Sequence, residues 1–215
     1  MTQTPVTVTP APHSEPRLAA ITETITRAFA TDPTWAPMLS PDVLDLAVAR
    51  RYWGFFVSTA QRYPWTFTID GDTGANANVT DSVAATTVWY PPGSDELTPA
   101  EQESFPDFAA ELLGAEKRDE LLEKSDLFEA AHPTEPHYYL SLLATNPAYS
   151  GRGLGMGLLA ANLAVLDDLG APSYLESSNP ANDQRYMALG YEKHGTIALP
   201  SGLTLNTFWR DPATR

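Results

Sequence analysis

The chain has 215 residues, of which 43% are hydrophobic and 19% charged, and this balance excludes an intrinsically disordered protein and suits one folded domain. It contains no cysteine, which excludes disulfides, zinc–thiolate sites and a cysteine nucleophile. A net charge of −14 repels polyanions, so no nucleic acid partner is expected, and no apolar run reaches the roughly 18 residues that cross a bilayer.

The N-terminal segment is rich in Thr and Pro, so residues 1–13 are expected to be a flexible terminus or to contain a first strand at 5–10. A helix is predicted to begin at Ser14, a capping residue followed by an acid and a proline in the first turn. Apolar residues then recur at helical spacing as far as about residue 30, at Leu18, Ile21, Ile25 and Phe29. Asp32-Pro33 ends this helix.

A second helix is predicted to begin at Pro41, with a wide apolar stripe made of Leu44, Val48, Tyr52, Phe55, Phe56 and Ala60. Residues 65–70 and 83–90 are typical of strands, and the segment 71–78 between them of a turn. Residues 97–131 form an acidic helical stretch with Phe105, Phe108, Leu112, Leu121, Leu122 and Phe128 on its apolar face. We therefore expect a single domain over 14–215 with a helical insertion at about 97–131.

A compact alternation of elements follows the linker at 133–136. A strand is predicted at 137–145, then a glycine-rich turn, a helix at about 153–169 and a buried strand at 172–177. A short helix at 182–189 and strands at 191–198 and 204–210 complete the chain. This order predicts an α/β (α+β) sheet protein.

Four alternating glycines, Gly151, Gly153, Gly155 and Gly157, lie between the strand and the helix. Their main-chain N–H groups and the positive end of the helix dipole are suited to binding a phosphate-bearing ligand. A Walker loop is excluded because Leu158 and Leu159 follow the last glycine, and the spacing does not match a dinucleotide fingerprint. The alternative is a tight turn with small residues that allow close packing.

The segment 140–159 resembles the acetyl-CoA-binding strand, loop and helix of the GNAT superfamily of N-acetyltransferases. In the preferred register Ser150 takes the place of the usual Gln or Arg, and Gly153 and Gly155 are the key glycines. A shifted register beginning at Arg152 fits the formula literally but delays the helix by one turn. The resemblance implies a mixed, mostly antiparallel sheet flanked by helices and splayed between its fourth and fifth strands, counting the one at 5–10 as the first.

The segment 174–191 resembles the next strand and helix of the same superfamily, including its Asn-x-x-x-Tyr pattern at Asn182 and Tyr186. Within the superfamily the chain is most similar to the puromycin N-acetyltransferases and their relatives, for example at 88–92, 135–140, 175–177 and 199–202. This likeness implies an antibiotic-resistance role.

The resemblance implies acetyl-CoA as co-substrate. The groups that would bind it are Leu143, Ala144 and Thr145 on the strand, Ser150, Gly151, Arg152, Gly153, Leu154 and Gly155 in the turn, and Asn182, whose other reading is a helix cap. Tyr186 is the expected general acid, with a phenol pKa near 10, about 1.5 units above that of a simple thiol. Glu176, an acid in a strand, is expected to act as base or to bind the substrate ammonium, with a structural hydrogen-bond role as the alternative.

The expected acceptor is a small-molecule primary amine in a pocket lined by Trp35, Tyr52, Trp89 and Tyr90. The alternatives are acetylation of a protein or peptide, and a module that binds acetyl-CoA without turnover. No metal is expected, because the four histidines have no ligand spacing. The N-terminus lacks secretory signal features, so we expect a cytoplasmic protein, monomeric or homodimeric.

Overall fold

The computed structural model describes residues 9–71 and 82–213. Six strands form one sheet in the order β1-β2-β3-β4-β6-β5, and every neighbouring pair is antiparallel except β3 and β4. The strands are β1 Thr66–Asp70, β2 Val83–Tyr90, β3 Tyr138–Thr145, β4 Ser173–Ser177, β5 Glu192–Ala198 and β6 Thr204–Arg210. The predicted mixed, mostly antiparallel sheet is confirmed.

The first predicted strand and the first predicted turn fall largely on residues 1–8 and 72–81, outside the described residues. At the edge of the described chain, Pro10 forms an isolated antiparallel bridge with Phe67, and the Ala11 N–H donates to the Thr66 carbonyl oxygen at 2.7 Å. The predicted fourth and fifth strands are therefore β3 and β4 of the structure.

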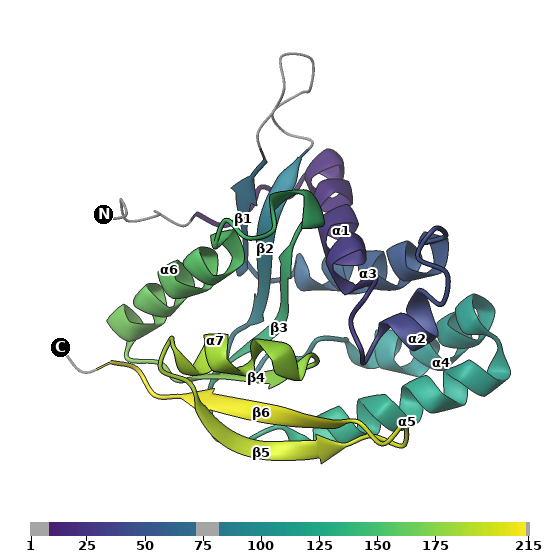
Figure 1. Ribbon diagram of the computed structural model, residues 1–215. Coiled ribbons are helices and arrows are strands. Elements are labelled where there is room, and N and C mark those ends of the chain that lie inside the picture. Colours follow the sequence, from purple (N-terminus) through teal and green to yellow (C-terminus); the bar gives the residue numbers. More distant parts are fainter. Residues whose placement is uncertain (1–8, 72–81, 214–215) are drawn as a thin grey trace, which may run out of the picture.

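Helices cover both faces of the first half of the sheet, with α1 Glu15–Phe29 and α3 Ala47–Ala60 on one side and α6 Leu154–Leu169 on the other (Figure 1). The core between α1, α3 and the sheet contains Ile21, Trp53 and Leu142. On the opposite face, the leucines of α6 pack against Leu140, Leu175 and Phe208. The helix expected from Ser14 is confirmed as α1, with Ser14 as its N-cap.

The second helix begins later than the sequence predicts, at Ala47 rather than Pro41, and a short helix, α2 Ala36–Leu39, precedes it. Between them the side chains of Asp42 and Asp45 accept hydrogen bonds from the N–H groups of Leu44 and Ala47. Such local bonds compete with helix formation. Leu44, expected on the apolar stripe, is 92% exposed.

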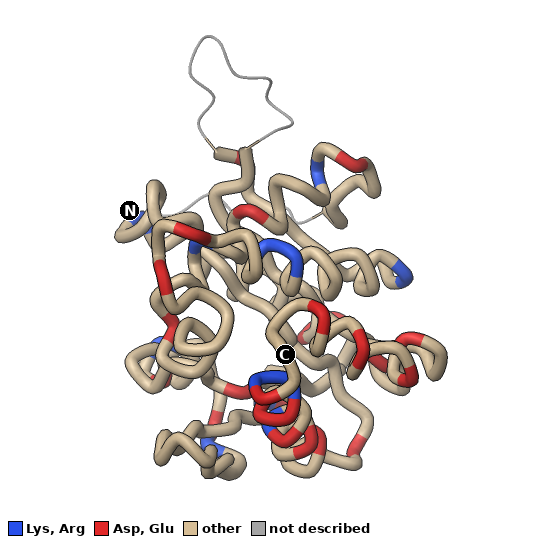
Figure 2. Tube along the Cα trace, turned by 90° about the vertical axis from the view of Figure 1, so that its right-hand side faces the viewer, with Lys and Arg blue, Asp and Glu red and all other residues tan. Residues whose placement is uncertain are grey.

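The acidic stretch forms two consecutive helices, α4 Pro99–Leu113 and α5 Ala115–Ala131, which separate at Gly114. Thr98 caps α4 through a capping box with Glu101. The buried side chains of the pair join the core of α1 and α3, while the end of α5 packs under β5 and β6. Acidic residues outnumber basic ones along α4 and α5. Figure 2 shows the charged positions on this side of the molecule.

The sheet opens between β3 and β4. Only Tyr138 and Tyr139 of β3 pair with β4, opposite Ser173 and Tyr174. Beyond these pairs the strands diverge, so among the described residues the remainder of β3 has no neighbouring strand on that side. This opening confirms the predicted splay.

The connections on either side of the opening contain the short helices η1 Pro147–Tyr149, η2 Pro180–Asn182 and α7 Asp183–Met187. Within the described part of the chain, every helix is too short or too polar to traverse a lipid bilayer.

Candidate functional site

A cleft of about 1340 Å³ enters the molecule where β3 and β4 separate. Its walls come from the turn after α1, from α3, from the loop after β2, and from α4 and α5. The other side is formed by β3, the turn that leads into α6, and the segment from β4 to α7. Elements from both ends of the chain therefore converge on one cavity.

The edge of β3 facing the cleft carries main-chain groups that no strand within residues 9–71 and 82–213 pairs. The N–H of Asn146 donates to the Ala84 carbonyl oxygen at 2.9 Å, which makes this a hydrogen-bonded pair of the β2–β3 ladder. Hydrogen-bonded and non-hydrogen-bonded pairs alternate in an antiparallel ladder. The N–H and C=O groups of Leu143 and Thr145 therefore point away from β2, toward the opening.

The main-chain groups of Ala144 do not face the cleft as those of Leu143 and Thr145 do, contrary to the sequence prediction. The same alternation directs its main-chain groups to Thr86 of β2. Its side chain is 2% exposed and packs in the core on the side of α1 and α3. The strand therefore offers Leu143 and Thr145, and not Ala144, to a ligand in the cleft.

The glycine turn leads into the first turn of α6 at the other end of this edge. Gly151 and Gly153 have φ values of 78° and 72°, which non-glycine residues rarely adopt. The helix begins at Leu154 with Gly153 as N-cap, and its first intrahelical bond runs from the Gly157 N–H to the Gly153 carbonyl at 2.8 Å. The N–H groups of Leu154, Gly155 and Met156 precede that bond and face no helical acceptor.

The helix α6 begins at Leu154, as expected from the preferred register with Gly153 and Gly155 as the key glycines. The shifted register would have started the helix one turn later. Ser150, Gly151, Gly153, Leu154 and Gly155 all line the cleft. The guanidinium of Arg152 instead lies over the Tyr149 ring, 5.1 Å from its centroid.

Tyr186 lies on α7 and lines the cleft. Its ring packs against Tyr191 and Phe208, and the residue is 9% exposed. Burial, and then the negative charges of Asp32 and Asp183, raise the phenol pKa above 10. The value near 10 expected from the sequence is therefore too low, because the sequence does not reveal this burial.

Asp32 ties the turn after α1 to the end of β4. It accepts hydrogen bonds from the N–H groups of Thr34 and Trp35 and, at 2.8 Å, from the Ser178 hydroxyl. Thr34 in turn donates its hydroxyl to the Ser178 carbonyl oxygen at 2.6 Å. Burial raises the pKa of Asp32, which the hydrogen bonds partly oppose. The sequence prediction used Asp32 only as a helix breaker.

Asn182 lies at the start of α7 and lines the cleft. Its side chain makes no capping hydrogen bond, and its Oδ1 instead accepts from Nη1 of Arg185 at 3.0 Å. The capping role in this region belongs to Asn179, which accepts from the Ala181 N–H at 3.0 Å.

Glu176 points into the cleft from β4. Its side chain is 3% exposed, and Oε1 is buried without a hydrogen-bond partner among the described residues. His132 lies beside it, with its Nδ1 3.5 Å from this oxygen. The phenols of Tyr139 and Tyr174 also interact with the Glu176 carboxylate, so a structural hydrogen-bond role and a binding role for the bare oxygen are both compatible with this geometry.

A second acid, Glu96, lines the same cleft and is missing from the sequence prediction. Its Oε1 accepts a hydrogen bond of 2.5 Å from Ser141 of β3. Burial raises the pKa of Glu96 to about 7, and the charge of Glu176 adds to the increase, while Ser141 and His132 oppose it.

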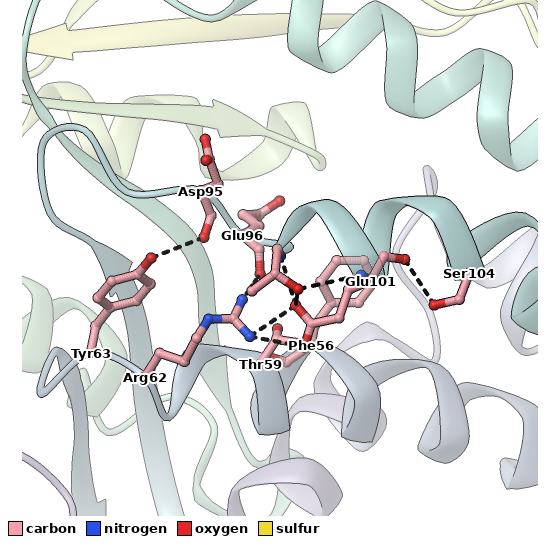
Figure 3. A network of polar contacts seen from close by, with 9 residues as sticks. Phe56, Thr59, Arg62, Tyr63, Asp95, Glu96, Glu101 and Ser104 are labelled. Carbon is pink, nitrogen blue, oxygen red and sulfur yellow. Dashed lines mark hydrogen bonds and ion pairs between the residues drawn. The ribbon is translucent and has the colours of Figure 1, made fainter.

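The loop that carries Glu96 is held by Arg62 at the end of α3 (Figure 3). Arg62 donates to both carboxylate oxygens of Glu101 at 2.9 Å and to the Glu96 carbonyl oxygen at 2.7 Å. Tyr63 donates to the Asp95 carbonyl oxygen at 3.3 Å. The main chain of Glu96 is fixed in this way while its carboxylate remains in the cleft.

Aromatic side chains line the cleft beside the two acids. Trp35, Tyr52 and Tyr90, three of the four aromatic residues expected there, are present. Trp89 is not, because strand alternation turns it to the opposite face, where its Nε1 donates to Asn162 of α6 at 3.1 Å. Burial and the charge of Glu96 raise the pKa of both Tyr52 and Tyr90.

No protein-family model matches the chain. Similar folds occur in solved structures. A Corynebacterium glutamicum protein described as histone acetyltransferase HPA2 and related acetyltransferase is 20% identical, with 98% of this chain and 99% of that chain covered and a TM-score of 0.66.

A mosquito arylalkylamine N-acetyltransferase like 5b is 16% identical over 91% of this chain and 95% of that chain, with a TM-score of 0.56. A chain of the NatC complex bound to Gag peptide and CoA is 13% identical over 96% and 98%, with a TM-score of 0.52. At these identities the likeness establishes a shared fold, which is the GNAT fold.

Proposed function

We propose that the chain is an N-acetyltransferase that moves the acetyl group of acetyl-CoA to a primary amine of a small molecule. One observation carries the proposal: the unpaired edge of β3 leads, inside one cleft, to the free N–H groups at the start of α6. This arrangement suits a ligand with an extended amide arm and a diphosphate. Acetyl-CoA has both, and the NatC complex of the same fold binds CoA.

The residues present fit this co-substrate. The main-chain groups of Leu143 and Thr145 would bind the pantetheine arm as a further strand would. The N–H groups between Ser150 and Gly155, with the dipole of the 16-residue helix α6, would bind the diphosphate. Arg152 in the turn and Asn182 on the cleft wall are the side chains that would add contacts.

Acetyl transfer forms a C–N bond between the amine and the acetyl carbon and breaks the C–S bond. The departing thiolate takes a proton from Tyr186, and the phenolate recovers one from the nitrogen of the new amide. The raised pKa keeps Tyr186 protonated at neutral pH but also makes it a weaker acid, so its proton transfer to the thiolate is uphill until the phenolate recovers the amide proton. Glu176 binds the incoming ammonium or accepts its first proton, which then passes to solvent.

The acceptor is proposed to be a small amine with an aromatic group. Trp35, Tyr52 and Tyr90 form an aromatic wall beside the carboxylates, and α4 and α5 close the cavity from one side. A mosquito protein of the same fold is described as an arylalkylamine N-acetyltransferase. The sequence likeness to puromycin N-acetyltransferases adds an aminonucleoside antibiotic, and hence a cytoplasmic resistance function, to the candidates.

Two alternative functions are separated from this one by the thiol-release test. A peptide acceptor is suggested by the NatC complex, which carries a Gag peptide. A module that binds acetyl-CoA without turnover would keep the β3 edge and the α6 N-terminus but would not need the buried, orphaned oxygen of Glu176.

The test is thiol release from acetyl-CoA with a panel of acceptors: 2-phenylethylamine, puromycin, an aminoglycoside, a polyamine and peptides with free N-termini. The proposal expects turnover with an arylalkylamine or puromycin. Turnover with peptides alone would favour the first alternative. CoA binding without turnover on any amine would favour the second.

A further inference from the structure

Two carboxylates, Glu96 and Glu176, face one cavity without a Lys or Arg partner among the residues that the structure describes. Arg62 bonds only the main-chain carbonyl of Glu96. Arg185 is the one basic Lys or Arg side chain among the described residues of the cleft wall, and it bonds Asn182 at the co-substrate end. A buried carboxylate requires a cation or a proton, since isolation in a low dielectric is costly.

The groups that face Glu96 come from every element packed around it. Ser141 of β3 donates to it, and Tyr139 of the same strand has its pKa raised by burial and by the charges of Glu176 and Glu96. Tyr52 of α3, Tyr90 of β2, Glu176 of β4 and His132 after α5 complete the surroundings. His132 is the one group in this set that can carry a positive charge.

We infer that Glu96 and Glu176 form a paired-carboxylate site for the ammonium group of an arylalkylamine, and that Glu96 is the group that accepts its proton. The inference deepens the proposed function and rests on it for the transfer step. The buried oxygen of Glu176 that lacks a partner supplies the ionic contact. Glu96, held by Ser141 and with its main chain fixed by Arg62, supplies the base.

One N–H bond of the ammonium breaks and its proton forms an O–H bond at Glu96, which leaves a neutral amine. The amine attacks the thioester carbon, the C–S bond breaks, and the second proton reaches the thiolate by way of Tyr186. The proton on Glu96 then leaves to solvent, so each acetylation releases one proton.

A binding experiment tests the site without acetyl-CoA. The protein is titrated with 2-phenylethylamine by calorimetry at pH 7 in phosphate and in MOPS, which differ in ionisation enthalpy and contain no primary amine. A pKa of about 7 leaves Glu96 roughly half protonated at this pH, and a bound cation displaces that proton. We expect release of about half a proton per site in the wild type and none in Glu96→Gln.

Two further variants sharpen the result. Glu176→Gln is expected to weaken amine binding at least tenfold because it removes the ionic contact. Glu103→Gln, the same change at an exposed position of α4, is expected to match the wild type. Proton release that persists in Glu96→Gln would show that another group loses the proton and would overturn the inference, as would absence of amine binding to the wild type.

The kinetic arm measures kcat with saturating 2-phenylethylamine and acetyl-CoA against pH. Glu96→Gln is expected to lower kcat by about 100-fold and to abolish the acid limb near pH 7. Ser141→Ala is expected to keep that limb but move it to higher pH, because it loses the bond that stabilises the ionised form.

The two arms separate the inference from the proposed function. Amine binding with Glu96-dependent proton release, but no CoA binding, would remove the transferase and retain the cation site. Turnover with an unchanged acid limb in Glu96→Gln would retain the transferase and remove Glu96 as the base.

Discussion

The hydroxyl oxygen of Thr145 occupies the space that a β-carbon on residue 155 would need. This contact joins the open edge of β3 to the first turn of α6, the two elements that the proposed co-substrate must bridge. Glycine is required at position 155 for close approach and not for an unusual backbone angle, since its φ is not positive.

Gly155→Ala is therefore expected to displace the start of α6 from β3. We expect a destabilisation of about 1–3 kcal/mol from overpacking and a CoA affinity at least tenfold lower. Chemical denaturation and calorimetry with CoA measure the two effects. The double variant Gly155→Ala/Thr145→Ala removes the obstructing hydroxyl, so it is expected to recover much of the stability.

Gly157→Ala is the matched control, because no atom lies within 4 Å of a β-carbon at this position. Alanine is favoured over glycine in a helix by up to about 1 kcal/mol. We expect unchanged or higher stability with normal CoA binding. Equal losses in Gly155→Ala and Gly157→Ala would show that the contact with Thr145 has no special role.

Tyr186→Phe removes the phenol and keeps the buried ring. If Tyr186 protonates the leaving thiolate, kcat for thiol release falls by about 100-fold or more, while the Kd of acetyl-CoA stays within about twofold. Steady-state kinetics and calorimetry on the same preparation check this. A kcat unchanged by the substitution would remove Tyr186 as the general acid.

Arg62→Ala is expected to loosen the loop that carries Glu96. It removes bonds to both oxygens of Glu101 and to the Glu96 carbonyl, so we expect about 1–2 kcal/mol of destabilisation and a higher KM for the amine. Arg51→Ala removes one surface ion pair, with side chains 53% and 70% exposed, and is expected to change stability by less than about 0.5 kcal/mol. An equal increase in the amine KM in Arg62→Ala and Arg51→Ala would contradict the role given to Arg62.

The pH dependence of stability follows from the raised pKa of Glu96, about 7 against an ordinary 4.5. Between these values the folded protein holds a proton that the unfolded chain has released. The stabilisation is therefore complete below pH 4.5 and is lost as the pH rises through 7. The raised pKa of Asp32 also lowers the stability as the pH rises. Asp32 is present in both the wild type and Glu96→Gln, so its contribution cancels when the two are compared.

We expect the stability of the wild type relative to Glu96→Gln to fall by on the order of 1–3 kcal/mol between pH 5 and pH 8. Urea unfolding of both proteins at the two pH values measures this difference. A difference that does not change with pH would show that Glu96 titrates in the folded protein as it does in the unfolded chain.

The elements nearest the proposed co-substrate are predictable from sequence because their signals are local. The strand 138–145, the turn and the helix from Leu154 lie within one short segment, and the glycines report its backbone geometry directly. The error at residues 41–46 is also local, since Asx turns at Asp42 and Asp45 replace the first helical turns.

The acceptor side is not predictable in the same way. Glu96 meets Ser141 across 45 residues and Asp32 meets Ser178 across 146, and no sequence pattern encodes these distances. Burial decides the properties of Glu96 and Tyr186, and it exists only after the chain has packed. The error at Trp89 was avoidable. Successive side chains of a strand point to opposite faces of the sheet, so the sequence alone could have placed Trp89 and Tyr90 on opposite faces.

The most direct measurement is a calorimetric titration of the purified protein with CoA and with acetyl-CoA. We expect saturable binding of one ligand per chain with a Kd in the micromolar range. A flat titration with both ligands, from a sample shown to be folded by circular dichroism, would contradict it.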